Sequence, residues 1–126
     1  MQKSKVNWYT DPIPYNNFIY LLGGSNNLAE RYDFKQNVWE SMAQITQDLN
    51  FTYGCNALYR DSILIASYSI QKVIIYSIPQ NNYQEVPNLA LTASRYRFML
   101  RGNNRIYLFE KGGRIFESGI NNILSW

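Results

Sequence analysis

The stretch Phe18-Ile19-Tyr20-Leu21-Leu22-Gly23-Gly24 decides the fold. Five consecutive aromatic or aliphatic residues that end in two glycines are typical of a short, buried β-strand followed by a sharp turn. Tyr32-Asp33 and Asn37-Val38-Trp39 follow at a distance that fits two more strands joined by a polar turn. This region therefore predicts a small antiparallel sheet.

The rest of the chain shows the same sequence pattern of short apolar runs between turn residues. Its apolar runs are three to five residues long and lie between Gly, Asn, Ser or Pro residues, at 62–66, 73–76, 105–109 and 114–116. Helical spacing is found only over Val38 to Leu49, where Val38, Met42, Ile45 and Leu49 would share one face. A helix there would leave Trp39 off that face, so we favour a loop over a helix. We expect an all-β fold.

Comparison of the chain with itself indicates a repeat with a period in the low forties. A shift of 44 aligns Ile19 with Ile63, Tyr32 with Tyr76, and Trp39 with Tyr83. A shift of 43 aligns Ile63 with Ile106, and a shift of 40 then aligns Tyr76 with Phe116. Four short strands in such a period are typical of a β-propeller blade.

The first unit resembles the kelch repeat, whose pattern is an apolar strand ending in Gly-Gly, then Tyr-Asp, then a Trp about six residues later. The second unit is degenerate, with Ser67-Tyr68 at the Gly-Gly position, Ser77 at the Asp position and Tyr83 at the Trp position. The third unit has Glu117 near the Asp position, and Arg95 where kelch repeats often carry an Arg. Trp8 would close a preceding, incomplete unit.

This resemblance implies a partial kelch-like β-propeller of about three four-stranded antiparallel blades. Residues 1–17 would be an N-terminal segment, and the three units would span 18–50, 51–93 and 94–126, the last of them a degenerate unit that is either complete or incomplete. In the second unit we expect strands near 54–59, 62–67, 72–77 and 83–86. The first unit would lack an innermost strand, because only Pro12 to Asn17 separates Tyr9 from the strand at Phe18. The motif residues expected to shape the blades are Gly23, Gly24, Tyr32, Asp33, Trp39, Tyr76 and Tyr83.

Composition excludes several kinds of chemistry. The 126 residues include no His and one Cys, so the chain can form neither an internal disulfide nor a Cys/His zinc site. It also lacks the imidazole of a Ser-His or Cys-His pair. A net charge of +3 is a mild excess, which makes nucleic acid an improbable partner. With no signal peptide and no long apolar stretch, we expect a soluble, cytoplasmic protein without a membrane span.

No residue set predicts catalysis, a metal site or a cofactor. Glu30, Asp33 and Glu40 lie close in sequence, but a turn and an outer-strand position suit Asp33 and Glu40 better than a glycosidase pair. Cys55 lacks a histidine base and is better read as a small buried side chain. The copper chemistry of galactose oxidase, another kelch-like propeller, needs His and cannot be carried over. The Gly-rich segments at 101–105 and 111–113 fit hairpin turns.

The candidate binding residues lie in loops and in one basic segment. Arg95-Tyr96-Arg97 interleaves charge with an aromatic ring, and on a strand Arg95 and Arg97 would share one face while Tyr96 points the other way. The resemblance places this segment near the ligand-facing rim of a propeller, where it would suit an acidic partner. The full set expected to contact a partner is Ser25, Asn26, Tyr53, Tyr68, Arg95, Tyr96 and Arg97.

Three functions stay open at this point. The first is a kelch-type protein-interaction or scaffold module without catalytic activity, which suits polar, Tyr-rich loops on a rigid scaffold. The second is a carbohydrate-binding or carbohydrate-active propeller, and the third is a structural subunit or fragment in a larger assembly. Because 126 residues hold just under three units of 43, the blades could not close a ring of four or more. We therefore expect a protein partner, a homo-oligomer or a longer chain.

Overall fold

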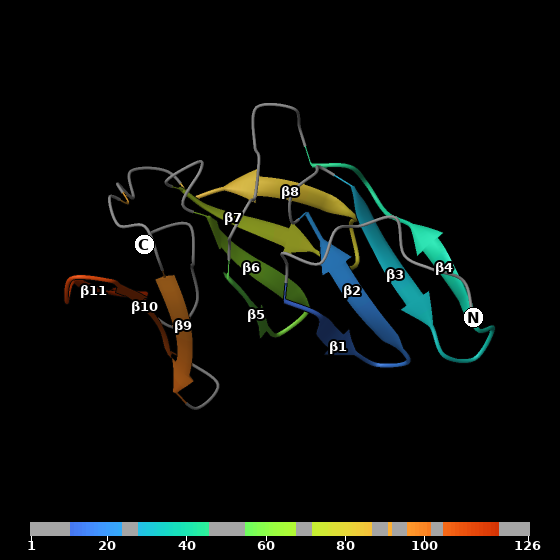
Figure 1. The fold of residues 1–126 in the computed structure, drawn as a ribbon, viewed down its shortest axis with the longest axis horizontal. Helices are drawn as coiled ribbons and strands as arrows, with labels where there is room; N and C mark the ends of the chain where they lie inside the picture. The colour runs from blue at the N-terminus through green and yellow to red at the C-terminus, as the bar shows by residue number, and fades with distance from the viewer. Residues whose placement is uncertain are drawn as a thin grey trace.

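The computed structural model describes residues 11–23, 28–45, 55–67, 72–86, 91, 96–101 and 105–118. Within these ranges the fold is all-β, as the sequence predicts, with eleven strands in three antiparallel sheets and no helix. Figure 1 shows the sheets side by side in chain order, with the second between the other two. The described residues contain no helix, and therefore none that is long and apolar enough to cross a membrane.

Each sheet is built from strands that are consecutive in sequence and paired in sequence order. Sheet one contains β1 (Ile13–Tyr15), β2 (Phe18–Leu22), β3 (Ala29–Asp33) and β4 (Val38–Ser41). Sheet two contains β5 (Cys55–Tyr59), β6 (Ser62–Ser67), β7 (Lys72–Ser77) and β8 (Asn82–Glu85). Sheet three contains β9 (Tyr96–Arg101), β10 (Arg105–Glu110) and β11 (Ile115–Ser118).

The four strands of sheet two lie where the sequence predicts them, but one other expectation needs correction. Sheet one has a first strand after all, because Ile13 to Tyr15 pair with Tyr20 to Phe18 through a two-residue turn. Residues 12–17 are too few for a full-length strand, but they contain a strand of three residues. Sheet three has three strands among the described residues, and residues 119–126, where a fourth would come, lie outside them.

The segment from Val38 divides into a strand and an irregular stretch. β4 ends at Ser41, and residues 42–45 have no helical turn. The backbone N–H of Met42 instead donates to the Ala29 carbonyl, which continues the pairing with β3. The preference against a helix is therefore confirmed for 38–45, and 46–49 lie outside the described residues.

Sheets one and two repeat each other with an offset of 44 residues, as the self-comparison predicts. β2, β3 and β4 begin at Phe18, Ala29 and Val38, and the equivalent positions 62, 73 and 82 lie in β6, β7 and β8. The bond from Met42 to Ala29 recurs as a bond from Val86 N–H to the Val73 carbonyl, at 2.9 Å. The repeat is thus present in the backbone hydrogen bonds as well as in the sequence.

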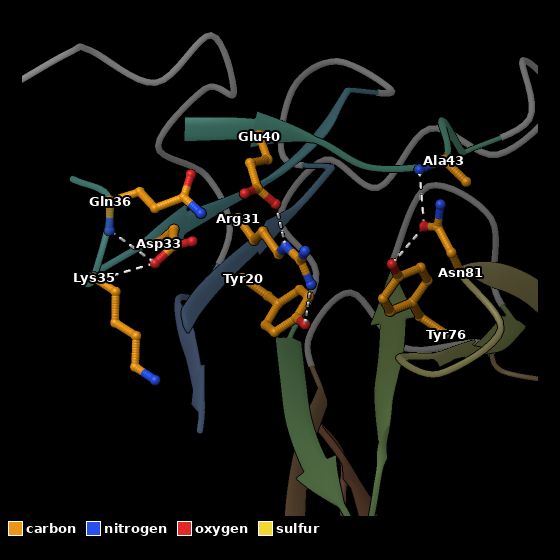
Figure 2. Close-up of polar contacts among 9 residues, drawn as sticks. All are labelled: Tyr20, Arg31, Asp33, Lys35, Gln36, Glu40, Ala43, Tyr76 and Asn81. Atoms are coloured by element: carbon orange, nitrogen blue, oxygen red, sulfur yellow. Dashed lines mark hydrogen bonds and ion pairs between the residues drawn. The ribbon is translucent and has the colours of Figure 1, made fainter. Parts of the chain in front are cut away.

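The hairpin that follows the Tyr-Asp motif is the most closely repeated element. Asp33 Oδ1 accepts from the backbone N–H groups of Lys35 and Gln36 at 2.8 and 3.2 Å (Figure 2), and the Ser77 hydroxyl accepts from Gln80 in the second unit. Both turns end in an Asn with positive φ, 57° at Asn37 and 52° at its counterpart. Asn tolerates this left-handed conformation better than most residues. The predicted turn roles of the Asp and Asn positions are confirmed.

Gly23 occupies the other turn of the motif. Its φ is 80°, a value that side-chain-bearing residues rarely adopt, and its N–H donates to the Leu28 carbonyl at 2.9 Å. The double glycine of the third unit, Gly112-Gly113, likewise has positive φ and makes the turn between β10 and β11. Gly24 lies outside the described residues.

One of the two alignments predicted for the third unit is confirmed, and the other is wrong. Ile106 and Leu108 on β10 are buried like Ile63 and Ile65 on β6, in agreement with a shift of 43. Strand pairing then matches Phe116 with Ile74, since Phe116 pairs with Leu108 and Ile74 pairs with Ile65. The alignment of Phe116 with Tyr76 at a shift of 40 is therefore wrong. Seven residues separate the paired Leu108 and Phe116, whereas eight separate the paired Ile65 and Ile74, and this difference of one residue moves the register.

The core lies between the sheets. Directly paired residues of antiparallel strands share a face, so one face of sheet two carries Ile63, Ile65, Ile74 and Tyr76, and the other carries Leu64, Ala66, Val73 and Ile75. The first set packs in one cluster with Ile13, Tyr20, Leu22 and Ala29 of sheet one. The second set packs with Tyr96, Phe98, Ile106, Leu108 and Phe116 of sheet three.

Sheet two is therefore buried on both faces, which explains why β6 and β7 are apolar without alternation. Ile63 through Ala66 are 0% exposed, as is Val73. The first strands of the three sheets lie next to one another, with β5 beside β9 and, over a shorter length, beside β1. The first strands thus form a row, and the three sheets extend outward from it with their faces packed together (Figure 1).

Neighbouring residues on β6 test this arrangement. Because Leu64 and Ile65 face opposite sheets, we expect Leu64→Ala and Ile65→Ala each to lower the free energy of unfolding by about 2–5 kcal/mol. Gln84→Ala, at an exposed position of β8, should change it by less than about 0.5 kcal/mol. Urea denaturation measures all three, and a near-neutral result for either β6 variant would mean that one face of sheet two is open.

Candidate interaction surface

The structure describes two of the predicted binding residues and separates them. Tyr96 and Arg97 follow each other on β9, so they point to opposite sides of sheet three, as the sequence predicts. Tyr96 is only 5% exposed and packs in the core against sheet two, which leaves its ring unable to contact a partner. Arg97 is exposed. Ser25, Asn26, Tyr53, Tyr68 and Arg95 lie outside the described residues.

Arg97 belongs to a larger surface that the sequence analysis missed. The outer side of sheet three, which we call the sheet-three face, consists of residues that are exposed or half-buried and share one side by strand pairing: Arg97, Met99, Arg105, Tyr107, Phe109, Ile115 and Glu117. Met99 is 48% and Ile115 57% exposed. The signal for this face is the alternation of β9, β10 and β11, which an apolar-run search does not register.

The sheet-three face has an apolar centre between charged positions. Met99 pairs with Tyr107, and Phe109 pairs with Ile115, so the four side chains form two adjacent rows. Arg97 stands beside Phe109, and Glu117 beside Tyr107. An ion pair joins Arg105 to Glu117, and both side chains are about half exposed. An apolar centre with a polar rim is the usual composition of a protein-binding surface.

Arg97 also lies near Cys55, which is the first residue of β5. The buried thiol has its pKa raised to about 12 by desolvation and by the nearby Asp11 carboxylate, and the Arg97 charge acts in the opposite direction. Asp11 Oδ2 accepts from the backbone N–H of Asn56 at 3.2 Å, which ties the start of sheet one to β5. Cys55 is thus a protonated, buried side chain at neutral pH, as expected for a structural position.

A polar junction joins sheets one and two at the edge of their shared core (Figure 2). Asn81 Oδ1 accepts from the Ala43 N–H at 3.0 Å and from the Tyr76 hydroxyl at 2.6 Å, and the Tyr83 hydroxyl donates to the Ala43 carbonyl at 2.8 Å. The two tyrosine rings are 4.8 Å apart. We call these contacts the Asn81 junction. Burial raises the pKa of Tyr76 to about 12 and that of Tyr83 further, so both hydroxyls stay protonated.

A second polar cluster lies on the face of sheet one that packs against sheet two. Arg31 Nε donates to Glu40 at 2.7 Å and Nη1 to the Tyr20 hydroxyl at 3.4 Å (Figure 2), while its guanidinium lies 4.0 Å from the centre of the Phe18 ring. This accounts for one of the three carboxylates considered for catalysis, and the turn at Asp33 accounts for the second. The pairing register puts Glu30 on the opposite face from Glu40.

The motif residues of unit one recur at the positions of the Asn81 junction. Tyr32 pairs with Trp39 as Tyr76 pairs with Tyr83, and the Tyr32 and Trp39 rings are 5.2 Å apart. Tyr83 therefore occupies the Trp position, as predicted. The described residues hold no group of three or more His, Cys, Asp or Glu side chains that could bind a metal ion.

Comparison of the chain with models of known protein families and with curated proteins found no match.

Substitutions at Asn81 test the junction. Asn81→Ala removes the acceptor used by Ala43 and Tyr76 and places alanine at positive φ, so we expect a loss of about 1–3 kcal/mol in the free energy of unfolding. Asn81→Asp keeps an acceptor oxygen and tolerates this backbone, so its loss should stay below about 1 kcal/mol. Equal losses in urea denaturation would show that the side-chain oxygen does not stabilise the junction.

Proposed function

We propose that this chain is a protein-interaction module built as part of a kelch-like β-propeller, without catalytic activity of its own. The observation that carries the proposal is the sheet-three face, which exposes Met99 on β9 and Ile115 on β11, on either side of the central strand β10. When a partner covers solvent-exposed apolar side chains grouped on one face, the free energy falls because apolar surface is removed from water.

The repeat supports the same function. On sheet two, the side equivalent to the sheet-three face carries Leu64 and Ala66, and it is fully covered by the next sheet. Sheet three presents the corresponding side to solvent, with Phe109 half-buried and Met99 exposed. Because the equivalent side of sheet two packs against a neighbouring sheet, this side of sheet three is suited to packing against another protein.

The kelch-like arrangement rests on the two matching four-stranded sheets and on their face-to-face packing through first strands. The Tyr-Asp and Asn-x-Trp positions of the kelch pattern make the same hairpin in both sheets, and their aromatic rings line one face of each. Radial packing of small antiparallel sheets is the architecture of a propeller. Arg97 gives the proposed binding surface a positive charge, which favours an acidic partner.

Affinity capture with charge-reversed bait tests this function. We expect the full chain to capture a protein from extracts of the cells that produce it, and Arg97→Glu to weaken that binding about tenfold, or 1.4 kcal/mol, through charge repulsion at the interface. Arg60→Glu is the matched control, because it reverses the same charge at an exposed turn of sheet two and should leave binding unchanged. Undiminished capture by the Arg97 variant would remove the sheet-three face from the binding surface.

A further inference from the structure

Three residues occupy the same place in the three units, at or just before the start of each first strand: Asp11, Cys55 and Arg97. Asp11 and Cys55 are 44 residues apart, which is the offset between sheets one and two. Cys55 pairs with Ala66, and Arg97 pairs with Phe109. The shift of 43 that aligns β6 with β10 makes Ala66 equivalent to Phe109. We call Asp11, Cys55 and Arg97 the first-strand positions.

The first two of these side chains accept a hydrogen bond from the unit that follows. Asp11 Oδ2 accepts from the backbone N–H of Asn56 at 3.2 Å. Burial raises the pKa of Cys55, and a hydrogen bond from the Phe98 backbone acts in the opposite direction, which identifies the Phe98 N–H as a donor to the sulfur. Asn56 and Phe98 each come directly after a first-strand position. The same bond therefore joins unit one to unit two and unit two to unit three.

At the third first-strand position the polarity is reversed. The guanidinium of Arg97 carries only donors and stays protonated, so it cannot accept from the backbone N–H of a following strand. Its side chain is exposed on the sheet-three face, and no carboxylate of the described residues forms an ion pair with it. Sheet three thus offers a charged donor at the place where the two preceding units offer an acceptor.

We propose that Arg97 selects the partner of the sheet-three face by binding the carboxylate of an Asp or Glu in an extended segment of that partner. The proposal rests on the proposed function, because it names what that surface recognises. A guanidinium and a carboxylate form two parallel, charge-assisted hydrogen bonds, which are stronger and more directional than neutral ones. The partner would thus supply the acceptor at this junction, whereas inside the chain the preceding unit supplies it.

Charge on the sheet-three face is concentrated at Arg97. An ion pair joins Arg105 to Glu117, so these two charges balance each other. Among the described residues of this face, the charge of Arg97 is left without a neutralising carboxylate. An apolar or basic partner that covered Arg97 would bury an uncompensated charge, which is strongly unfavourable. A partner that covers this face therefore needs an acidic group opposite Arg97.

The neighbours of Arg97 define the rest of the partner segment. Phe109 lies beside Arg97 on β10, and Ile115 lies beside Phe109 on β11. Met99 lies two residues further along β9, on the same side of the sheet and 48% exposed. A carboxylate at Arg97 would therefore have apolar side chains next to it both across the strands and along β9. The segment that fits carries apolar residues beside its acid.

Selection from a random peptide phage-display library on the full chain tests this recognition. We expect the selected peptides to carry an Asp or Glu next to apolar residues. For a synthetic peptide of the selected sequence, Arg97→Gln should raise the dissociation constant at least about tenfold, because charge-assisted hydrogen bonds are lost. Arg60→Gln is the matched control, since it removes the same charge at an exposed turn of sheet two and should leave the dissociation constant unchanged.

Exchange of the charges shows whether the acid of the peptide meets Arg97 directly. Gln in place of that acid should weaken binding to the wild type about as much as Arg97→Gln does, and should have little further effect on the Arg97→Gln variant. A peptide with Arg in place of the acid should bind Arg97→Glu more tightly than it binds the wild type. A general attraction between net charges would not produce this coupling. Circular dichroism melting curves verify that each variant is folded.

Peptides selected without a carboxylate, binding that tolerates Arg97→Gln, or a selection that yields no peptide would overturn the proposal. Met99→Asp, which alters the apolar part of the same face, separates this failure from a failure of the proposed function. If Met99→Asp weakens a peptide that tolerates Arg97→Gln, Arg97 selects nothing and the proposed interaction surface stands. If binding tolerates both variants, the carboxylate recognition and the proposed surface fail together.

Discussion

The structure depends on covering both faces of sheet two. Its two central strands carry apolar side chains on both sides, and nearly all are fully buried between the neighbouring sheets. Four short strands have too little area on one face to bury a core of their own, so stability comes from stacking one sheet on another. Because every sheet has the same two sides, the same requirement applies to the ends of the stack.

Polar groups set the geometry of this stacking. Apolar faces alone would allow sheets to slide, since hydrophobic burial has no direction. At the Asn81 junction, one side-chain oxygen accepts from the preceding unit and from the Tyr76 hydroxyl, while Tyr83 bonds the same residue of the preceding unit. The junction thus ties the tyrosine pair of sheet two to the backbone of the preceding unit, and Tyr32, Asn37 and Trp39 hold the equivalent positions in sheet one.

Much of the fold could be predicted from the sequence, because it depends on local rules. Runs such as Ser62-Ile63-Leu64-Ile65-Ala66 between turn residues locate strands, and Tyr-Asp with a later Asn locates a hairpin. The offset of 44 was also accessible, since sheets one and two share their turn lengths. The shorter turn at Gly112-Gly113 shifted the third unit, and a register shift cannot be found by aligning similar side chains such as Tyr76 and Phe116.

The surface was harder to predict than the fold. The alternation of Tyr96 and Arg97 was correctly expected, but which of the two faces solvent depends on the sheet that packs against β9, and that is a tertiary fact. Tyr96 turned inward and so left the predicted binding set. Met99 and Ile115 drew no attention in the sequence because single apolar residues are common on protein surfaces. Their significance comes from strand pairing, which places them on one side with Tyr107 and Phe109.

The central claim is that sheet two is covered by sheet one on one side and by sheet three on the other. Nuclear Overhauser effects between side chains measure it most directly. The account predicts contacts between the ring protons of Tyr20 and Tyr76, whose ring centres are 6.3 Å apart, together with contacts between the Ala66 and Leu108 methyl groups of the second core cluster. The absence of either set in a folded sample, or contacts from Tyr20 to Leu108, would contradict this order of sheets.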